Sequence, residues 1–294
     1  MKHAGVLGLV LVLAAVQAAG EPRITVNGSL EWERMEISAV MALDLASAGV
    51  QLPTGRVQAE EILSHEFPGL LSPHLLAIPV DSSSTVEDMV REGKFPLGNV
   101  GALARGAHKT PPAFSGDFSL LSAAYRIDIT SISSLLIRHS QAAELRQPLQ
   151  PVPAADYTGI IIIADGELPI HGKRSGAFVQ PCLFPKVWDT EMNLIYERNT
   201  LDPAAQERNM LVQYVSQESV FQNSPSGLSP ELLGRVGAKP LRILARGVFG
   251  ALPTDPIIDR EDALLILSSA ENRRLLREGR IALVLHSDVL RNTF

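Results

Sequence analysis

The sequence contains a single cysteine, Cys182, among 294 residues. One cysteine cannot form an intramolecular disulfide, and it cannot supply the paired thiolates of a structural zinc site. A basic surplus is also absent, because 26 Lys and Arg stand against 32 Asp and Glu, for a net charge of -6. Nucleic-acid-binding domains usually carry a basic patch, so we expect no nucleic-acid partner. Stability must therefore come from hydrophobic burial in one large or two moderate cores.

Long apolar runs are absent beyond the start of the chain. Residues 1–20 combine a positive start at Lys2, an apolar run from Ala4 to Val16 and small residues after it, which is typical of a secretory signal peptide. This run is shorter than the roughly 20 apolar residues that span a bilayer. We therefore expect a periplasmic mature protein with no transmembrane segment. No cysteine follows the run, so no lipid anchor is expected.

Apolar patterning predicts two α+β domains. The first, residues 21–146, shows helical spacing over 37–48 and 56–65. The segment 147–155 contains three prolines in the run QPLQPVPAA, which neither a helix nor a central strand accommodates, so it is predicted to be a linker. In the first domain, strands are predicted at residues 23–32, 75–80, 98–105 and 119–130, and a further helix at 131–139.

The second domain is predicted to cover residues 156–294. Its first strand contains the run Ile160 to Ile163, typical of a strand buried on both faces. A strand at 240–250, helices that begin at Asp259 and Ser268, and a returning strand at 280–286 form a strand-helix-strand unit. The segment 216–239 is predicted to be a long loop or lid. The fold class expected is α+β, with two small domains and mixed or antiparallel sheets.

Catalytic signatures are missing from the sequence. It contains no G-x-S-x-G or S-x-x-K motif, and its seven histidines are scattered. The segment from Gly166 to Ser175 looks superficially like a phosphate loop, but its glycines are too far apart and Arg174 separates Lys173 from Ser175. We therefore predict a protein that is not an enzyme, with no catalytic residues and no cofactor.

Reactive side chains nevertheless gather between Asp165 and Cys182. Asp165, Glu167, His171 and Cys182 are all residue types that bind zinc. They lack the paired spacing, such as C-x-x-C or H-x-x-x-H, that preorganises a tetrahedral site. We predict no metal site, and these four residues are the candidates to test.

Several segments together resemble a known family. They are YTGIIIIAD, QPCLFPKVWD, MNLIYER, PLRILARGVFG, TDPIIDREDALLIL and RIALVLH, preceded in the first half by VDSSSTVEDMV and GNVGALARGAHK. In this order they resemble the FlgP-type flagellar accessory proteins and related outer-membrane lipoproteins, and the insertion DGELPIHGKRSG is similar to the variant in spirochaetal periplasmic homologues. The resemblance implies a ring, disc or collar-like component around the flagellar motor.

The function predicted is that of an exported periplasmic structural or assembly protein associated with the flagellar motor. We expect partners among copies of itself or other periplasmic and flagellar proteins. Exposed strand edges or sheet faces would support such assembly, and the candidate strands are 157–165, 240–250 and 280–286. Two alternatives stay open. One is a periplasmic small-molecule-binding or hydrolytic protein that uses the loop from Asp165 to Cys182, with residues 216–239 as its lid. The other is an envelope protein of the same fold with no flagellar role.

Overall fold

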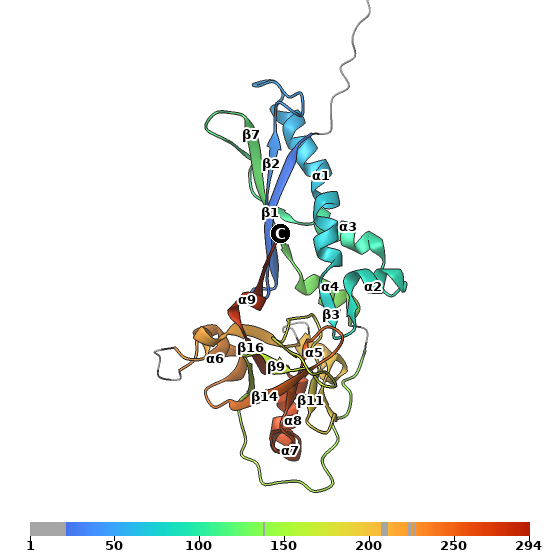
Figure 1. Ribbon diagram of the computed structural model, residues 1–294, viewed down its shortest axis with the longest axis vertical. Coiled ribbons are helices and arrows are strands. Elements are labelled where there is room, and N and C mark those ends of the chain that lie inside the picture. The colour runs from blue at the N-terminus through green and yellow to red at the C-terminus, as the bar shows by residue number, and fades with distance from the viewer. Residues whose placement is uncertain (1–21, 138, 207–210, 223–224, 226) are drawn as a thin grey trace, which may run out of the picture.

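The computed structural model describes residues 22–294 apart from 138, 207–210, 223–224 and 226. Two domains follow one another along the long axis of the molecule, with the first at the top of Figure 1. The predicted signal peptide, residues 1–20, lies outside the described residues. Within the described part of the chain, no helix combines the length and apolarity that crossing a bilayer requires.

The first domain is built on an antiparallel six-stranded sheet in the order β17-β1-β2-β7-β5, with β6 also paired to β7. The strands predicted at 23–32 and 119–130 are present as β1 and β7. The bounds of the six strands are β1 Ile24–Glu31, β2 Glu36–Asp44, β5 His108–Lys109, β6 Ala113–Phe114, β7 Leu120–Asp128 and β17 Arg291–Thr293.

Strand β2 occupies the segment for which we predicted a helix at 37–48, so that prediction is wrong. Its buried residues are Ile37, Ala39, Met41 and Leu43, which is the period of two of a strand with one buried face. The helical interpretation counted Val40 as a core residue, yet its side chain is 47% exposed on the opposite face. Pairing with β1 on one side and β7 on the other decides between the two periods.

Helices cover one face of this sheet. Helix α1 (Arg56–Leu76) lies alongside the strands in Figure 1 and extends well beyond the predicted 56–65. Helix α3 (Leu97–Arg105) occupies the segment 98–105, for which we predicted a strand. Val100 and Ala104, one helical turn apart, are both buried, which is the pattern of a helix with one buried face. The buried residues of α1 recur every four positions and are Ala59, Leu63, Phe67, Leu71 and Leu75.

A short hairpin and two further helices complete the first domain. The hairpin pairs β3 (Pro79–Asp81) with β4 (Ser84–Thr85) and is followed directly by helix α2 (Val86–Arg91). The strand predicted at 75–80 is therefore the end of α1 at residues 75–76, a turn at 77–78 and the start of β3 at 79–80. Helix α4 (Thr130–Leu136) overlaps the helix predicted at 131–139 and begins one residue before it.

The second domain contains a seven-stranded mixed sheet in the order β12-β11-β15-β14-β8-β16-β13. Strands β14, β8, β16 and β13 are mutually parallel, whereas β15 is antiparallel to β14. The α+β fold with mixed and antiparallel sheets is confirmed. The strands are β8 Ile160–Ala164, β11 Val187–Asp189, β12 Leu194–Tyr196, β13 Gln213–Ser216, β14 Leu241–Phe249, β15 Asp255–Ile258 and β16 Ile281–Leu285, and a separate hairpin joins β9 Leu168–Pro169 to β10 Gly176–Ala177.

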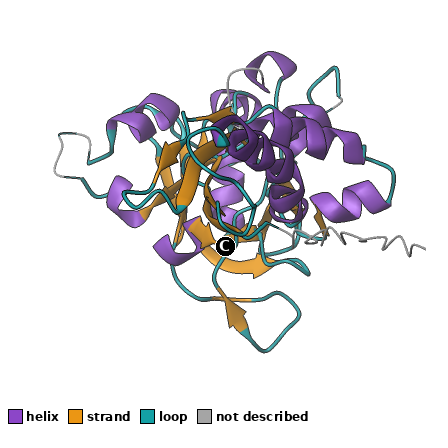
Figure 2. Cartoon of the chain, turned by 90° about the horizontal axis from the view of Figure 1, so that it is seen from above, coloured by secondary structure: helices purple, strands orange, loops and turns teal. Residues whose placement is uncertain are grey.

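Helices flank the strands in the view from above (Figure 2). The predicted helix starts at Asp259 and Ser268 correspond to α7 and α8, although Ser269 is the residue whose hydroxyl caps α8. The predicted loop or lid at 216–239 includes helix α6. The helical bounds in this domain are α5 Pro203–Gln206, α6 Pro230–Val236, α7 Arg260–Ser268, α8 Ala270–Arg277 and α9 Ser287–Leu290, with 3-10 turns at Arg198–Thr200 and Gln217–Ser219.

The strands that we proposed as free edges are all interior. Strand β8 lies between β14 and β16, β14 lies between β15 and β8, and β16 lies between β8 and β13. Strands β8 and β16 are paired on both sides, so they offer no free edge to a neighbouring copy. Strand β14 pairs with β8 over Leu241–Leu244 and with β15 over Ala245–Phe249. For β8 and β16 the prediction is wrong, because hydrophobic patterning identifies buried strands, and buried strands lie inside a sheet.

The linker and the chain's last strand both tie the parts of the molecule together. Residues 147–155 contain no helix or strand and lie along the second domain, where the backbone N–H of Val152 donates to Ser268 Oγ at 3.0 Å. We predicted that the second domain would continue to residue 294. The structure instead places β17 in the sheet of the first domain, beside β1.

Candidate functional site

Three parallel strands of the second sheet end side by side and place polar residues at one edge. Asp165 directly follows β8, His286 directly follows β16, and Ser216 is the last residue of β13. These strands are neighbours in the order β8-β16-β13, so their carboxyl ends meet. In sheets of parallel strands, ligands bind in the crevice outside the carboxyl ends. This edge is therefore the candidate site.

A cavity of about 600 Å³ lies at this edge, between the two domains. Its volume falls within the roughly 300–1,000 Å³ of small-molecule sites. The first domain contributes the turn after β1, and the second contributes the strand ends and the start of α9. The lining residues are Glu31, Glu33, Arg34, Asp165, Ser216, Gln217, Glu218, His286, Ser287, Leu290 and Arg291.

Several charged groups of this cavity are already engaged. Glu33 Oε1 accepts the backbone N–H of Ser216 at 2.8 Å, so the first domain holds the end of β13. Glu31 lies between two arginines, with 3.7 Å from one carboxylate oxygen to Arg34 Nη1 and 3.7 Å from the other to Arg291 Nε. The Glu33–Ser216 bond connects the domains across the cavity, and the two arginines beside Glu31 give the cavity both signs of charge.

His286 has a structural role at this edge. Its Nδ1 accepts the backbone N–H of Asp288 at 3.4 Å and thereby caps helix α9. Its ring also lies 4.7 Å, centroid to centroid, from the ring of Phe178. An imidazole that accepts through Nδ1 carries its proton on Nε2 when it is neutral. The ring is thus oriented by the fold, with Nε2 as the donor.

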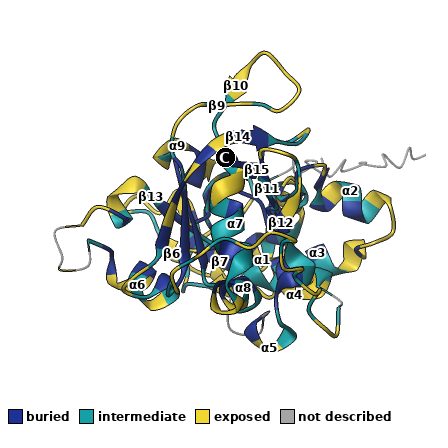
Figure 3. Ribbon diagram, turned by 90° about the horizontal axis from the view of Figure 1, so that it is seen from below, coloured by how far each residue is buried: buried dark blue, intermediate teal, exposed yellow. Residues whose placement is uncertain are grey.

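The structure separates the four metal-ligand candidates from the sequence. Asp165 lines the cavity, whereas Glu167 and His171 belong to the exposed β9–β10 hairpin that projects from the molecule in Figure 3. The ring of His171 is 6.0 Å from that of Phe249, and Cys182 is fully buried. Among the described residues, no group of three or more His, Cys, Asp and Glu side chains could hold a metal ion.

Cys182 is part of the core at the junction of the domains. Its backbone N–H donates to the hydroxyl of Tyr214 at 3.0 Å, and the same hydroxyl donates to the Cys182 carbonyl at 2.7 Å. Burial, reinforced by the charge of Asp255, raises the pKa of the Cys182 thiol. A thiol in this environment is a poor nucleophile, because the thiolate is the reactive form.

Asp255 is a buried carboxylate that no sequence pattern singles out. Its side chain is fully buried and accepts hydrogen bonds from the backbone N–H of Lys186 at 3.0 Å and from Trp188 Nε1 at 3.3 Å. Thr254 Oγ1 donates at 3.1 Å, and Ser82 of the first domain supplies a further hydrogen bond. Burial raises the pKa of Asp255, although the donors oppose this shift. Because its hydrogen-bond donors come from both domains, Asp255 joins the two domains.

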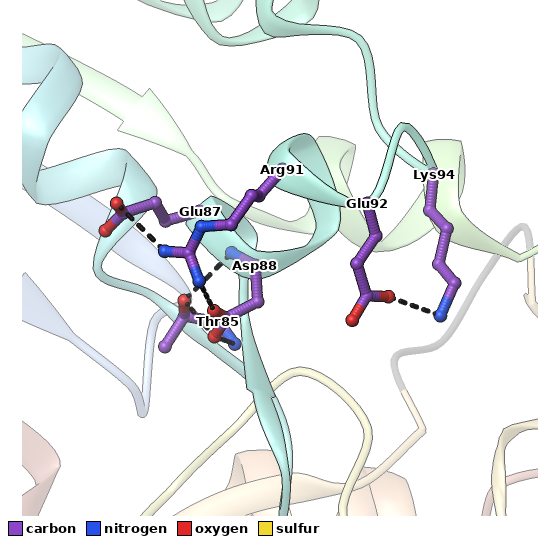
Figure 4. A network of polar contacts seen from close by, with 6 residues as sticks. All are labelled: Thr85, Glu87, Asp88, Arg91, Glu92 and Lys94. Carbon is purple, nitrogen blue, oxygen red and sulfur yellow. Dashed lines mark hydrogen bonds and ion pairs between the residues drawn. The ribbon is translucent and has the colours of Figure 1, made fainter.

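A second polar cluster surrounds α2 and is shown in Figure 4. Thr85 and Asp88 form a capping box, and their hydrogen bonds lower the pKa of Asp88. Arg91 pairs with Asp88 at 3.0 Å and with Glu87 at 3.3 Å. These contacts satisfy the first turn of a short helix and its dipole, so the cluster stabilises α2.

Two protein-family models match the chain. The model for the N-terminal domain of Treponema pallidum Tp0624 matches residues 23–135, and the model for the second domain of the same protein matches residues 159–287. These matches indicate a spirochaetal family. The two matched ranges contain the strands of the two sheets apart from β17, and they leave the Pro-rich segment between them. A search of curated proteins found no match.

The spirochaetal part of the predicted resemblance is thus supported, while the FlgP-type assignment stays a prediction. Sequence reasoning found Asp165 but missed Glu33, Ser216 and His286. A usable signal did exist, since Asp165 and His286 are the first polar residues after strongly apolar strands. The missing information was the order of the strands, which brings three distant segments to the same edge.

Proposed function

We propose that the protein is an exported structural or assembly component of the bacterial cell envelope, with the flagellar motor as its setting. It acts without catalysis and fixes the relative orientation of its two domains and of the partners that they contact. The export step is supported by the features of residues 1–20, and the flagellar setting by the resemblance of the strand segments to FlgP-type proteins.

The observation that carries this proposal is the joint between the domains. The β3–β4 hairpin of the first domain inserts against the second: Leu183 N–H donates to the Pro79 carbonyl at 3.0 Å, and Phe184 N–H donates to the Val80 carbonyl at 2.8 Å. Leu252 N–H donates to the Ser82 carbonyl at 3.0 Å. These are main-chain bonds, which leave little freedom for sliding.

The joint is held at a second place by the chain's last segment. Trp32 N–H donates to the carbonyl of Leu290 at 2.9 Å, and the Trp32 ring contacts the edge of Tyr214 at 5.8 Å between centroids. Domains within one chain move relative to one another by default unless their interface is extensive. Two separated attachments oppose such motion, which suits a structural part better than a binding protein that closes around its ligand.

Deletion of the gene in the native bacterium tests the proposal. We expect loss or distortion of a peripheral motor density in electron cryotomography, together with impaired swimming. The purified mature protein should sediment as an oligomer. A monomer whose deletion leaves the motor density and swimming unchanged would contradict the flagellar setting, whereas a damaged envelope with a normal motor would indicate an envelope role without a flagellar link.

The cavity at the strand ends favours a second candidate, the binding of a small polar molecule. It contains Asp165 from the predicted loop and Ser216 to Glu218 from the predicted lid, but not His171 or Cys182. Thermal-shift screening of polar small molecules tests this idea. A hit should lose its effect in Asp165→Asn and keep it in His171→Ala, and a binder that depends on His171 would point to the hairpin instead.

A further inference from the structure

The chain ends by crossing from one domain to the other. Strand β16 lies between β8 and β13 in the second sheet, the single turn of α9 follows, and β17 then pairs with β1 of the first sheet. Figure 1 shows this crossing as the red segment that rises past α9 to the blue strand β1. The last segment is therefore a strand supplied to the first domain from outside its own sequence range.

Backbone contacts hold this strand. Gly28 and Phe294 exchange two N–H to carbonyl bonds, both 2.9 Å long. The register pairs Ser29 with Thr293 and Glu31 with Arg291. All three side chains of β17 are exposed, so the strand itself buries little apolar surface. Main-chain pairing of this kind accepts a strand of suitable register from any source.

Phe294 gives the contact its specificity. Its ring stacks on the ring of His74 from α1, with 3.7 Å between centroids and 17° between planes. It also lies over Gly28, where a Cβ atom would be only 2.4 Å from two of the ring carbons. Gly28 and His74 thus form a seat for an aromatic side chain next to the edge of β1 that β17 occupies.

We propose that this edge of β1 is a strand-acceptor site that takes the β17 segment of a second copy of the chain. In such an exchanged dimer, each first domain receives Arg291 to Phe294 from its partner, and every contact of β17 is remade. The part that must change is α9, a single turn of four residues between two strands, and with it the bond from Trp32 N–H to the Leu290 carbonyl, which the partner's copy of Leu290 would remake. Exchange of an identical element is a low-cost route to a dimer, because its interactions are preserved.

This inference rests on the proposed assembly function, to which it assigns a mechanism. The connection can lengthen, because residues 286–290 separate β16 from β17 and an extended chain spans about 3.3–3.6 Å per residue. High local concentration within an envelope assembly favours exchange over closure within one chain, since exchange depends on concentration and closure does not.

Disulfide trapping between two differently tagged single-cysteine variants tests the site, in a Cys182→Ala background. Ser29→Cys is made in one copy and Thr293→Cys in the other, and the two are co-expressed with signal peptide and oxidised. This pair is suitable because the Gly28–Phe294 pair is hydrogen-bonded, so the next pair along an antiparallel ladder is the close, non-hydrogen-bonded one. We expect a cross-linked heterodimer, with the 29–293 linkage identified by mass spectrometry.

Two controls make the result decisive. The double variant Ser29→Cys/Thr293→Cys in one chain must form a disulfide, which shows that the geometry permits the bond. Thr25→Cys with Thr293→Cys is out of register and should give no cross-link. If the double variant closes only within one chain and the co-expressed pair yields no heterodimer, strand exchange is wrong. If an oligomer persists although no heterodimer is cross-linked, the assembly function stands and only strand exchange is wrong. If the cross-linked dimer forms but deletion of the gene leaves the motor unchanged, strand exchange stands and the flagellar setting is wrong.

Discussion

Replacement of Tyr214 by Phe should destabilise the protein by about 3 kcal/mol. The Tyr214 hydroxyl is fully buried and is the hydrogen-bond partner of both the N–H and the carbonyl of Cys182, at 3.0 and 2.7 Å. Phe fills the same space, so no large cavity forms and the loss is confined to these two bonds. A buried polar group left without a partner costs roughly 1–3 kcal/mol, and here two groups lose theirs.

Tyr196→Phe provides a matched control. The Tyr196 hydroxyl is also buried in the second domain, and it donates a single bond of 2.8 Å to the carbonyl of Leu211. That carbonyl also accepts from Arg235 Nη2 at 3.3 Å, so it retains a partner when the hydroxyl is removed. The expected loss is about 1 kcal/mol, the net value of one ordinary hydrogen bond.

Chemical and thermal unfolding followed by tryptophan fluorescence measures the difference. The protein has two tryptophans, and Trp32 contacts the edge of the Tyr214 ring, so the signal reports on this region directly. For a protein of this size, 1 kcal/mol corresponds to about 2–4 °C in the midpoint, so Tyr214→Phe should lower it by roughly 6–12 °C. Equal midpoints for the two variants would refute the reasoning, because they would mean that the backbone of Cys182 does not depend on Tyr214.

Three further predictions concern the second domain and its joint with the first. Gly159→Ala should lower stability by about 2 kcal/mol or more in denaturant titrations, because the new Cβ would lie 2.4 Å from the Cα of Val236, where backbone must move. Asp255→Asn should change the pH dependence of the melting temperature. Because the pKa of Asp255 is raised in the folded protein, the wild type gains stability relative to the variant as the pH falls through that pKa toward 3.8. A constant difference in melting temperature between pH 7 and pH 4 would contradict this. Glu33→Ala should speed hydrogen exchange at the amide of Ser216, whereas an unchanged rate would show that the carboxylate does not hold β13.

A strand that is buried on both faces could be predicted from the sequence, whereas one strand with a single buried face could not be told from a helix. Ile160 to Ile163 form a continuous β-branched run, and β8 lies in the centre of its sheet as such a run implies. The segment 37–48 has apolar residues that satisfy both a period of 3.6 and a period of two. Pairing with β1, which directly precedes it, and with β7, which lies about eighty residues further along the chain, selects the strand.

The candidate site was predictable only in part, because it is made by the meeting of distant segments. Asp165 stands out in sequence as an acid after an apolar strand. Glu33 and Ser216 are ordinary surface residues until the domains are joined, and then one accepts the amide of the other. The spacing of apolar residues along the sequence indicates which side of a helix or strand is buried. It contains no information about which elements are neighbours in the fold.

The same contacts bury the reactive side chains and stiffen the joint between the domains. Cys182 and Asp255 are the side chains whose chemistry invites a catalytic interpretation, yet each is fully buried beside a contact between the domains. Leu183, next to Cys182, donates to the carbonyl of Pro79, and Asp255 shares a hydrogen bond with Ser82 of the same hairpin. A buried polar group is stable only when its partners are fixed. A change in the angle between the domains would break these bonds, so the same residues that lack access to a substrate make the joint stiff.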